Sequence, residues 1–381
     1  MVSVAVVHYF FRVAGGAEKL AGSLVKALRE SGFDAELVTS KLDSRVYALL
    51  GLPELPCRVI PEPLTVRMAD SVHKRVRRFG KFMSYFTYRH LCSILESEEL
   101  KGFDLVVETQ LNHPLPVDAS YIHYPVVLQR PSSTSLLRRF YDGVMERLWS
   151  RMRGTPKLIL TNSTWTASKI EQAYPGLAEV RVLHPPVDYE FFAAASREDR
   201  EKLIITVSRL IPSKRVDAIL RVAAQLPEYK FALVGSTLGA SNEKYVKYLA
   251  STASNVEVMP NASRELVREL LGKARFYLHP PYPEHFGIAV AEAAAAGAVP
   301  IVLRDGGAWT DIVSKIDRRL GYEDIGEVPR IVRNLEKSPD LEELRERSMR
   351  VASTFKYEVF RSNVREVFGE LLRKREAGKR R

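Results

Sequence analysis

Two glutamates on either side of a glycine mark the stretch that is best suited to bind a phosphorylated ligand. Glu284 precedes Phe286 and Gly287 in a proline-rich loop, and Glu292 follows in an alanine-rich run with seven residues between the two glutamates. We expect a helix to begin here, so that the N–H groups of Phe286, Gly287 and Ile288 lie at the positive end of its dipole, where an anion is stabilised by about 0.3–1 kcal/mol. Gly287 lets a ligand approach the backbone closely, and Glu292, a turn and a half later, can accept hydrogen bonds from a ribose diol. The alternative is an amphipathic helix whose glutamates are only solvated.

This stretch resembles the signature of the retaining glycosyltransferases with two Rossmann-like domains, the family-4 kind. Their signature, Pro-x-x-Glu-x-Phe-Gly-x-x-x-x-Glu-Ala-x-Ala-x-Gly-x-Pro, is matched from Pro281 to Gly297, and its last proline is displaced by one residue to Pro300. The resemblance implies that Glu284 orients the hydroxyls of a sugar. It also implies that Glu292 binds the ribose of a nucleotide-diphosphate sugar.

Two basic residues follow the predicted strand 203–208, in a loop that leads into a helix. Arg209 and Lys214 could neutralise a diphosphate leaving group without a metal ion, although such pairs also occur on ordinary surfaces. The pair is similar to the Arg-x4-Lys element of the same family, which implies that it holds the donor diphosphate. Gly235 ends the next predicted strand, where the backbone is expected to pass close to the nucleotide.

A glycine pair near the start of the chain is a further candidate. Gly15 and Gly16 lie between the predicted strand 2–7 and the predicted helix 19–29, where such a pair forms either a tight turn or a loop around a phosphate or sugar. Its resemblance to the Gly-Gly-Ala-Glu loop of the family implies that the loop faces the donor diphosphate and the acceptor.

A histidine ends one of the predicted strands, at 119–123. Ligands of open α/β sheets bind at the carboxyl ends of strands, so His123 is a candidate site residue, although a histidine there is otherwise a hydrogen-bonded core residue. The family resemblance implies that His123 lies beside the transferred sugar. The wording Tyr-x-His-Tyr-Pro is similar to the mannosyltransferases that act on lipid-linked oligosaccharides. Asn162 and Ser163 resemble the family's Asn-Ser segment, for which a helix N-cap is the alternative.

In this interpretation the catalytic residues are His123, Glu284, Arg209 and Lys214, and the donor-binding residues are Gly15, Gly16, Gly235, Phe286, Gly287, Ile288 and Glu292, with no metal ligand.

Short β-rich runs alternate with helical or loop stretches along the chain, which is typical of parallel sheets. The runs are 2–7, 34–39, 103–107, 119–123, 157–161 and 180–183, and then 203–208, 230–235, 255–259, 275–279 and 299–303. A chain of 381 residues also exceeds what one hydrophobic core usually supports. We therefore expect an α/β protein with two Rossmann-like domains whose parallel sheets face a cleft, the GT-B architecture. The expected parts are an acceptor-binding domain at 1–185, a nucleotide-sugar-binding domain at 186–355, and a C-terminal helix with a basic tail at 356–381 that packs on the first domain.

The net charge of +11 comes from two segments. Residues 74–90 carry +6 without an acidic side chain, and the tail 373–381 carries +5, so the rest of the chain is neutral overall. The helical pattern over 72–90 separates apolar from basic side chains, as in a helix that lies on an anionic membrane surface. Its alternatives are an ordinary surface helix and a nucleic-acid patch, for which no accompanying motif is present.

The cysteine usage and the absence of sorting signals favour a cytoplasmic protein. Cys57 and Cys92 lie far apart without a Cys-x-x-Cys pair or a histidine cluster, which indicates neither a disulfide scaffold nor a zinc site. The apolar start lacks the basic residues and the cleavage site of a signal peptide, and we expect no transmembrane segment. The two basic segments would make the protein peripheral on the cytoplasmic membrane face.

The resemblance implies metal-independent transfer of a hexose, with retention, from a nucleotide-diphosphate sugar to a polyprenyl-linked or glycan acceptor. Mannose from GDP-mannose is the first choice, and UDP-sugars stay open. We expect no cofactor besides the donor substrate and no nucleic-acid partner. One alternative is a nucleotide-sugar epimerase of the same architecture, against which the two motifs argue. Another is a basic protein that binds nucleic acid or a membrane surface.

Overall fold

The chain divides into two compact units in a computed structural model that describes residues 1–64, 68, 90–95, 97–128, 140, 143, 144, 147, 154–237 and 242–379. Unit 1 comprises Met1–Asn162, Thr166–Leu183 and Phe360–Arg381, and unit 2 comprises Ser163–Trp165 and His184–Val359. The predicted basic helix at 72–90 lies outside the described residues except for His90. The basic tail continues the last helix as far as residue 379, and its final two residues also lie outside the described part.

Unit 1 is built on a seven-stranded sheet in which all neighbouring strands are parallel, in the order β5-β3-β1-β6-β7-β8-β9. Its strands and helices are β1 (Ser3–Val7), α1 (Gly16–Glu30), β3 (Asp34–Thr39), α2 (Arg45–Leu50), β5 (Cys57–Val59), α5 (Glu98–Lys101), β6 (Leu105–Glu108), β7 (Ala119–Ile122), the 3₁₀ turn η2 (Val126–Leu128), β8 (Leu158–Thr161), most of α7 (Thr164–Ala173) and β9 (Glu179–Val182). The strands β2 (Phe10–Phe11) and β4 (Lys41–Leu42) form a separate two-stranded parallel sheet.

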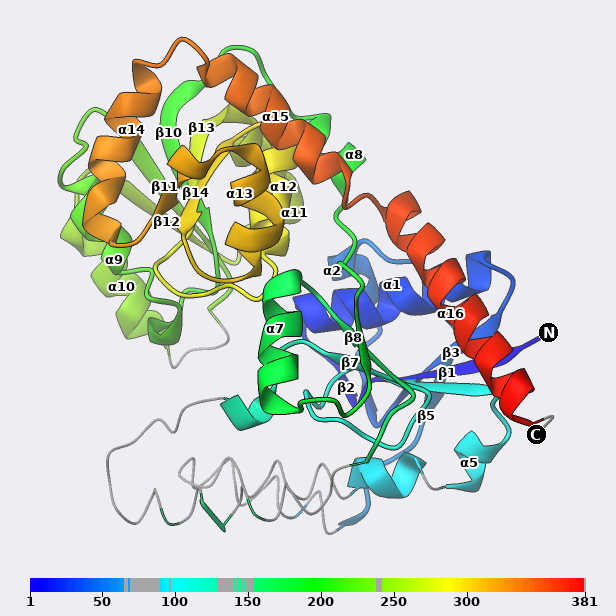
Figure 1. The fold of residues 1–381 in the computed structure, drawn as a ribbon. Helices are drawn as coiled ribbons and strands as arrows, with labels where there is room; N and C mark the ends of the chain where they lie inside the picture. The colour runs from blue at the N-terminus through cyan, green and yellow to red at the C-terminus, as the bar shows by residue number, and fades with distance from the viewer. Residues whose placement is uncertain are drawn as a thin grey trace. The chain divides into compact units, whose positions relative to one another are not determined.

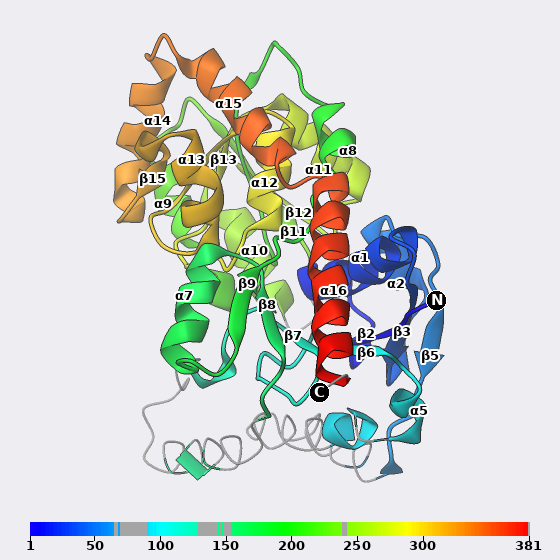
Figure 2. The same ribbon diagram turned by 45° about the vertical axis from the view of Figure 1, so that its right-hand side comes forward.

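The central strands of unit 1 are buried on both faces, which is why they read as unbroken apolar runs. In β1, Val4, Ala5, Val6 and Val7 are all buried. The last helix, α16 (Tyr357–Lys379), returns to this unit and runs along it (Figure 2). Its Phe368 ring packs against Phe33, which lies between α1 and β3, and ion pairs join α16 to α1 and β9.

Unit 2 contains a six-stranded parallel sheet in the order β12-β11-β10-β13-β14-β15. Its elements are α8 (Tyr189–Ala193), β10 (Glu201–Val207), η3 (Pro212–Lys214), α9 (Ala218–Ala223), β11 (Lys230–Gly235), α10 (Glu243–Thr252), β12 (Val256–Pro260), α11 (Arg264–Lys273), β13 (Ala274–Leu278), α12 (Ile288–Ala295), β14 (Val299–Leu303), the π-helix η5 (Ala308–Val313), α13 (Ser314–Ile316), η6 (Arg318–Leu320), β15 (Gly321–Tyr322), η7 (Ile325–Glu327), α14 (Val328–Glu336) and α15 (Leu341–Ser353). Figure 1 shows the strands between α9, α10 and α14 on one side and α8, α11 and α12 on the other.

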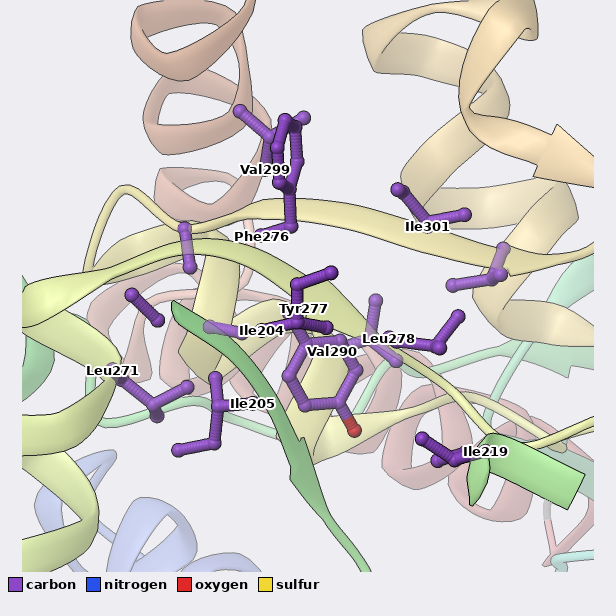
Figure 3. Packing of buried hydrophobic residues seen from close by; sticks show 14 of the residues in the cluster. Ile204, Ile205, Ile219, Leu271, Phe276, Tyr277, Leu278, Val290, Val299 and Ile301 are labelled. Atoms are coloured by element: carbon purple, nitrogen blue, oxygen red, sulfur yellow. The ribbon is translucent and has the colours of Figure 1, made fainter. Parts of the chain in front are cut away.

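The core of unit 2 is made by alternate side chains of its strands. Phe276 and Tyr277 point to opposite faces of β13, and Phe276 lies beside Val299 while Tyr277 lies with Ile205 and Val290 (Figure 3). Helix α12 is buried at all its alanines except the first, because small side chains let the helix pack close to the sheet. The expected pair of parallel α/β sheets is therefore present.

In each unit the strand order reverses at one place, and in open α/β sheets ligands bind at the carboxyl ends of the strands that flank such a switch point. In unit 1 the switch point lies between β1 and β6, and in unit 2 it lies between β10 and β13. The residues that follow these four strands are therefore the ones best placed to contact a ligand.

Two details differ from the sequence-based expectation. The segment after His184, where the expected boundary between the two domains lies, includes helix α8, and Val187 forms a bridge with Lys356. The segment Ser163–Trp165 belongs to unit 2, although the expected boundary between the domains lies at residue 185. The reason is a set of hydrogen bonds from this segment to unit 2, described below.

Among the residues that the structure describes, no helix combines the length and apolar character needed to span a lipid bilayer.

Candidate functional site

The two loops at the switch point of unit 2 bring together Lys214 and Glu284, which lie 70 positions apart in the sequence. Lys214 ends the 3₁₀ turn η3 after β10, and Glu284 lies in the loop between β13 and α12. The Lys214 Nζ donates to Glu284 Oε2 at 3.3 Å. Both were predicted as site residues from separate motifs.

The Glu284 carboxylate is held by several donors. The Tyr282 hydroxyl donates to Oε2 at 3.0 Å, and the backbone N–H of His285 donates to Oε1 at 3.1 Å. Burial would raise the pKa of this carboxyl, but the charge of Lys214, followed by those of His279 and His285, lowers it to about 2. Glu284 is therefore ionised throughout the physiological pH range, so it can accept hydrogen bonds but cannot donate one.

The groups around this pair form a compact aromatic and cationic cluster. The Lys214 ammonium lies 4.0 Å from the centre of the Tyr282 ring, a cation–π contact. His279 is buried, its ring centre is 4.8 Å from that of Tyr282, and its Nε2 is 3.8 Å from Glu284 Oε2. Burial lowers the pKa of His279 to about 4, with Glu284 and Lys214 acting in opposite directions. The His279 ring is therefore neutral at physiological pH.

The backbone of the Glu284 loop is fixed by its neighbours. Arg215 adopts a left-handed conformation, with φ of 52°, and its guanidinium donates to the carbonyl of Pro281 at 2.8 Å. The carbonyl of Glu284 accepts the N–H of Gly307 at 2.7 Å. Gly306 has a φ of 97°, and a Cβ there would lie 2.5 Å from the same carbonyl. Only glycine fits where the two loops touch.

Helix α12 begins where the sequence predicts, with Gly287 as its N-cap at a φ of 97°. A Cβ on Gly287 would lie 3.0 Å from the Cβ of Ala308 and 3.1 Å from Val290. Phe286 is buried and anchors the helix start, and Ile288 opens the first turn, whose N–H groups have no acceptor within the helix. Such a turn can bind an anion.

Glu292 lies half-buried on the same helix, near the core of the sheet. Burial raises the pKa of Tyr277, and the negative charges of Glu284 and Glu292 raise it further. All three side chains therefore lie in one region. The Tyr277 hydroxyl donates to the carbonyl of Val207 at the end of β10. Glu292 and Glu284 thus both lie close to the switch point.

The remaining predicted residues of unit 2 flank the same strand ends. Arg209 follows β10 with an exposed side chain, and no ion pair of its guanidinium is found among the described residues. Gly235 ends β11, and a Cβ there would lie 1.7 Å from the carbonyl oxygen of Ser208. Any other residue at 235 would push β11 away from the loop that carries Arg209.

The predicted residues of unit 1 lie at the ends of its own strands. Gly15 is the N-cap of α1 and Gly16 is the first residue of that helix, so the pair lies between the short strand β2 and α1. His123 directly follows β7, and its Nε2 is 3.0 Å from the carbonyl of Thr109, the residue that follows β6. Gly15, Gly16 and His123 thus all belong to unit 1, whereas Lys214 and Glu284 belong to unit 2.

Sequence reasoning missed a buried polar network around Asp311. Asp311 lies in the π-helix η5 and accepts hydrogen bonds from the N–H and hydroxyl of Thr164, from Thr310, and from His184 Nε2 at 2.8 Å. The Ser163 hydroxyl donates to the carbonyl of His285, which joins the start of α7 to the loop before α12. A π-helix has no simple sequence signature, and the local sequence offers only the glycine pair Gly306-Gly307, separated from Asp311 by three residues.

The His279 and Tyr282 contacts were also missed, although Tyr282 lies inside the glutamate signature and His279 lies two residues before it. Their proximity to the Glu284 carboxylate depends on how the Pro280–Pro283 loop turns, which residue types alone do not determine. Among the described side chains, no group of three or more His, Cys, Asp and Glu residues is arranged to hold a metal ion.

Comparison with known sequences gives one family and a set of mannosyltransferases. Residues 188–348 match the family described as glycosyl transferases group 1. The chain is 26% identical to the "GDP-Man:Man(3)GlcNAc(2)-PP-Dol alpha-1,2-mannosyltransferase" of Candida glabrata over 55% of this chain and 48% of the relative. It is 25% identical to the Neurospora crassa protein of the same name over 81% of this chain and 68% of the relative. The chain spans about half the length of most of the curated relatives it matches.

Comparison with solved structures extends the similarity to the whole chain. WaaG, a glycosyltransferase involved in lipopolysaccharide biosynthesis, aligns over 96% of this chain and 99% of its own, with a TM-score of 0.66 and 17% identity. The sucrose-phosphate synthase of Thermosynechococcus elongatus aligns over 99% of this chain and 100% of its own, with a TM-score of 0.69 and 15% identity. At such identities the likeness concerns the fold, which is the expected GT-B fold.

Proposed function

Residues 188–348 belong to the glycosyl transferases group 1 family, and from this premise we propose that the chain transfers a hexose from a nucleotide-diphosphate sugar to a lipid-linked acceptor with retention of configuration. The observation that carries the proposal is the meeting of Lys214 and Glu284 beside the first turn of α12, at the switch point of unit 2. This arrangement offers a cation, a fixed carboxylate and free N–H groups at the place where such a sheet binds ligands.

In the proposed mechanism, unit 2 holds the donor. Lys214 and Arg209, with the amides near Gly287, neutralise the diphosphate as negative charge grows on it during cleavage of its bond to the sugar. Glu284 accepts hydrogen bonds from hydroxyls of the sugar, a role suited to a carboxylate that stays ionised. Glu292 accepts hydrogen bonds from the ribose diol. No metal ion takes part in this scheme.

GDP-mannose is the proposed donor, because the curated relatives carry it in their names. A polyprenyl-linked oligosaccharide is the proposed acceptor on the same basis, and unit 1, with Gly15, Gly16 and His123 after its strands, is proposed to bind it. We further propose that the basic segments 72–90 and 373–381 attach the protein to the cytoplasmic face of an anionic membrane.

Donor binding is tested by thermal stabilisation of the purified protein with GDP-, UDP- and ADP-sugars in the presence of EDTA. We expect GDP-mannose to raise Tm in the wild type and in Lys337→Ala, whose exposed lysine lies away from the site, but not in Lys214→Ala. A shift that requires a divalent metal would contradict the metal-independent scheme. A shift of equal size in Lys214→Ala would contradict the assigned site.

Transfer is tested with labelled GDP-mannose and a polyprenyl-diphosphate oligosaccharide in detergent, followed by NMR of the anomeric proton in the product. The α-anomer is expected, as in the donor. Release of an epimerised nucleotide sugar without an acceptor would favour an epimerase, a reading that the family match does not favour. Salt-sensitive binding to duplex DNA without a response to any nucleotide sugar would favour a basic nucleic-acid-binding protein.

A further inference from the structure

Tyr282 contacts both partners of the ion pair between Lys214 and Glu284. Its hydroxyl donates to Glu284 Oε2 at 3.0 Å, and the Lys214 ammonium lies 4.0 Å from the centre of its ring. One side chain therefore joins the cation that is proposed to hold the donor diphosphate to the carboxylate that is proposed to hold the sugar.

The backbone and the ring of Tyr282 are both fixed by neighbouring groups. The carbonyl of Pro280 accepts the Tyr282 N–H at 2.8 Å. Pro283 follows directly in the sequence, which restricts the backbone of Tyr282 to extended conformations. The ring packs against the buried ring of His279, with 4.8 Å between their centres. The phenol is thus placed by contacts that involve neither partner of the ion pair.

The hydrogen bond between Tyr282 and Glu284 has one direction. Burial, followed by the charge of Glu284, raises the pKa of Tyr282 well above its usual range, so the phenol keeps its proton. The Glu284 carboxyl is ionised and can only accept hydrogen bonds. The phenol is therefore a neutral donor to this carboxylate throughout the physiological pH range.

Each oxygen of the Glu284 carboxylate has a neutral donor of its own. Tyr282 donates to Oε2, and the backbone N–H of His285 donates to Oε1 at 3.1 Å. The bond from Lys214 Nζ to Oε2 measures 3.3 Å, which is longer than the roughly 2.7–2.9 Å of strong charge-assisted hydrogen bonds. The carboxylate therefore keeps one donor on each oxygen when the Lys214 ammonium turns to another anion.

We propose that Tyr282 is a positioning residue that holds the Glu284 carboxylate in place while Lys214 shifts its ammonium from that carboxylate to the donor diphosphate. This inference rests on the proposed function, because it assigns the diphosphate to Lys214 and the sugar to Glu284. A buried carboxylate that loses its cation is destabilised unless other donors remain. The Tyr282 hydroxyl is such a donor, and the ring keeps the ammonium beside the carboxylate.

Two substitutions separate the hydroxyl of Tyr282 from its ring. Tyr282→Phe removes the hydrogen bond to Glu284 and keeps the ring beside Lys214, whereas Tyr282→Leu removes both. We expect kcat of Tyr282→Phe to fall about 10-fold while Kd for GDP changes less than about 2-fold, because GDP lacks the sugar that Glu284 holds. In Tyr282→Leu, Kd for GDP should also rise by about 5-fold, since the cation–π contact is lost. Tyr248→Phe, which alters an exposed tyrosine of α10, is the control and should match the wild type in both.

The pH profile of kcat provides a readout that a purely structural role would not change. Glu284 must stay ionised to accept the hydroxyls of the sugar, so protonation of this carboxyl ends activity at acid pH. Loss of the Tyr282 donor raises the pKa of Glu284, so the acidic limb should move up by about one pH unit in Tyr282→Phe. This variant leaves unchanged the other titratable groups around the carboxylate, which are Lys214 on η3, His279 after β13 and His285 in the same loop.

Urea unfolding tests the contact between Tyr282 and Glu284 without any substrate. Glu284→Leu removes the acceptor, so Tyr282→Phe should lower the unfolding midpoint in the wild type and have little further effect in Glu284→Leu. Equal losses in both backgrounds would overturn the inference, as would a kcat and an acidic limb of Tyr282→Phe that match the wild type. Absence of transfer by the wild type would instead refute the proposed function, and the unfolding cycle would then still show whether Tyr282 holds Glu284.

Discussion

Lys214 and Glu284 form an ion pair across the switch point of unit 2, with Nζ and Oε2 3.3 Å apart and side chains that are 21% and 24% exposed. At this burial the pair is shielded from much of the solvent, so its attraction is stronger than that of a surface ion pair. Each partner also keeps an open side. A diphosphate could therefore approach the ammonium while hydroxyls approach the carboxylate.

Replacing Glu284 by glutamine should remove a pH-dependent part of the stability. The pKa of Glu284 is lowered from 4.5 to about 2, because Lys214, His279, His285 and the Tyr282 hydroxyl together outweigh burial. Its ionised form therefore stabilises the fold above pH 4.5, and this contribution is lost as the pH falls towards 2. We expect Glu284→Gln to be less stable than the wild type by about 3 kcal/mol at pH 7, with a difference in stability that narrows as the pH falls from 4.5 towards 2. Urea unfolding across this range measures the gap. A gap that does not change with pH would refute the assignment.

Replacing Glu292 by glutamine should weaken donor binding without unfolding the protein. The carboxylate is proposed to accept two hydroxyl hydrogens of the ribose, and hydrogen bonds to a charged group contribute about 1.5–3 kcal/mol. Glu292→Gln should therefore raise Kd for GDP-mannose by roughly 10-fold or more in calorimetry. Glu343→Gln, on the exposed face of α15, is the control and should leave Kd unchanged. The ratio of Kd for a deoxyribose donor to Kd for the ribose donor should also be smaller in Glu292→Gln than in the wild type. An unchanged ratio would mean that Glu292 does not bind the ribose diol.

Alanine at Gly287 should combine backbone strain with crowding. The φ of 97° costs an L-residue about 1 kcal/mol or more, and the new Cβ would press on Ala308 at 3.0 Å. Gly32→Ala provides the control, since Gly32 has a similar φ of 91° with nothing within 4 Å of the added Cβ. Thermal unfolding should show a larger loss for Gly287→Ala, and only that variant should lose the stabilisation by GDP-mannose. An equal loss of thermal stability in both variants would mean that the structure relaxes around the new Cβ at residue 287 and removes its close contact with Ala308.

Methionine at Arg200 should affect stability and leave the chemistry intact. The buried guanidinium donates to the carbonyls of Ala274 at 2.6 Å and Ala296 at 2.5 Å, at the ends of α11 and α12. Loss of these bonds leaves buried acceptors unpaired, so Arg200→Met should cost about 2–4 kcal/mol in chemical denaturation. Arg197→Met, an exposed neighbour, should cost little. Below the midpoint of unfolding, kcat of Arg200→Met should match the wild type, and a specific loss of kcat would argue that α12 has moved.

Much of the fold could be predicted because the strands of a doubly covered parallel sheet are rich in apolar and β-branched residues. The runs at 34–39 and 230–235 coincide with β3 and β11. By contrast, β15 consists of two residues, Gly321 and Tyr322, and is too short to leave a periodic pattern. The helix start at Ile288 was predictable because an alanine-rich run begins directly after Gly287, and alanine favours helix.

The contacts within the candidate site could not be predicted in the same way. The meeting of Lys214 with Glu284 depends on which strands are neighbours in the sheet, and local patterns do not encode the strand order. The contact of His123 Nε2 involves the Thr109 carbonyl, a backbone group that every residue carries. The attachment of Thr164 to unit 2 depends on the irregular π-turn around Asp311.

The return of α16 to unit 1 determines the order in which the protein can be completed on the ribosome. Phe33 is made early, but Phe368, its aromatic partner, is made last, after the whole of residues 184–359. Since synthesis proceeds from the N-terminus, the second unit has all of its chain available while the first still lacks a helix. A nascent chain that stalls before residue 360 therefore carries an unfinished first unit, and chaperones would meet it there.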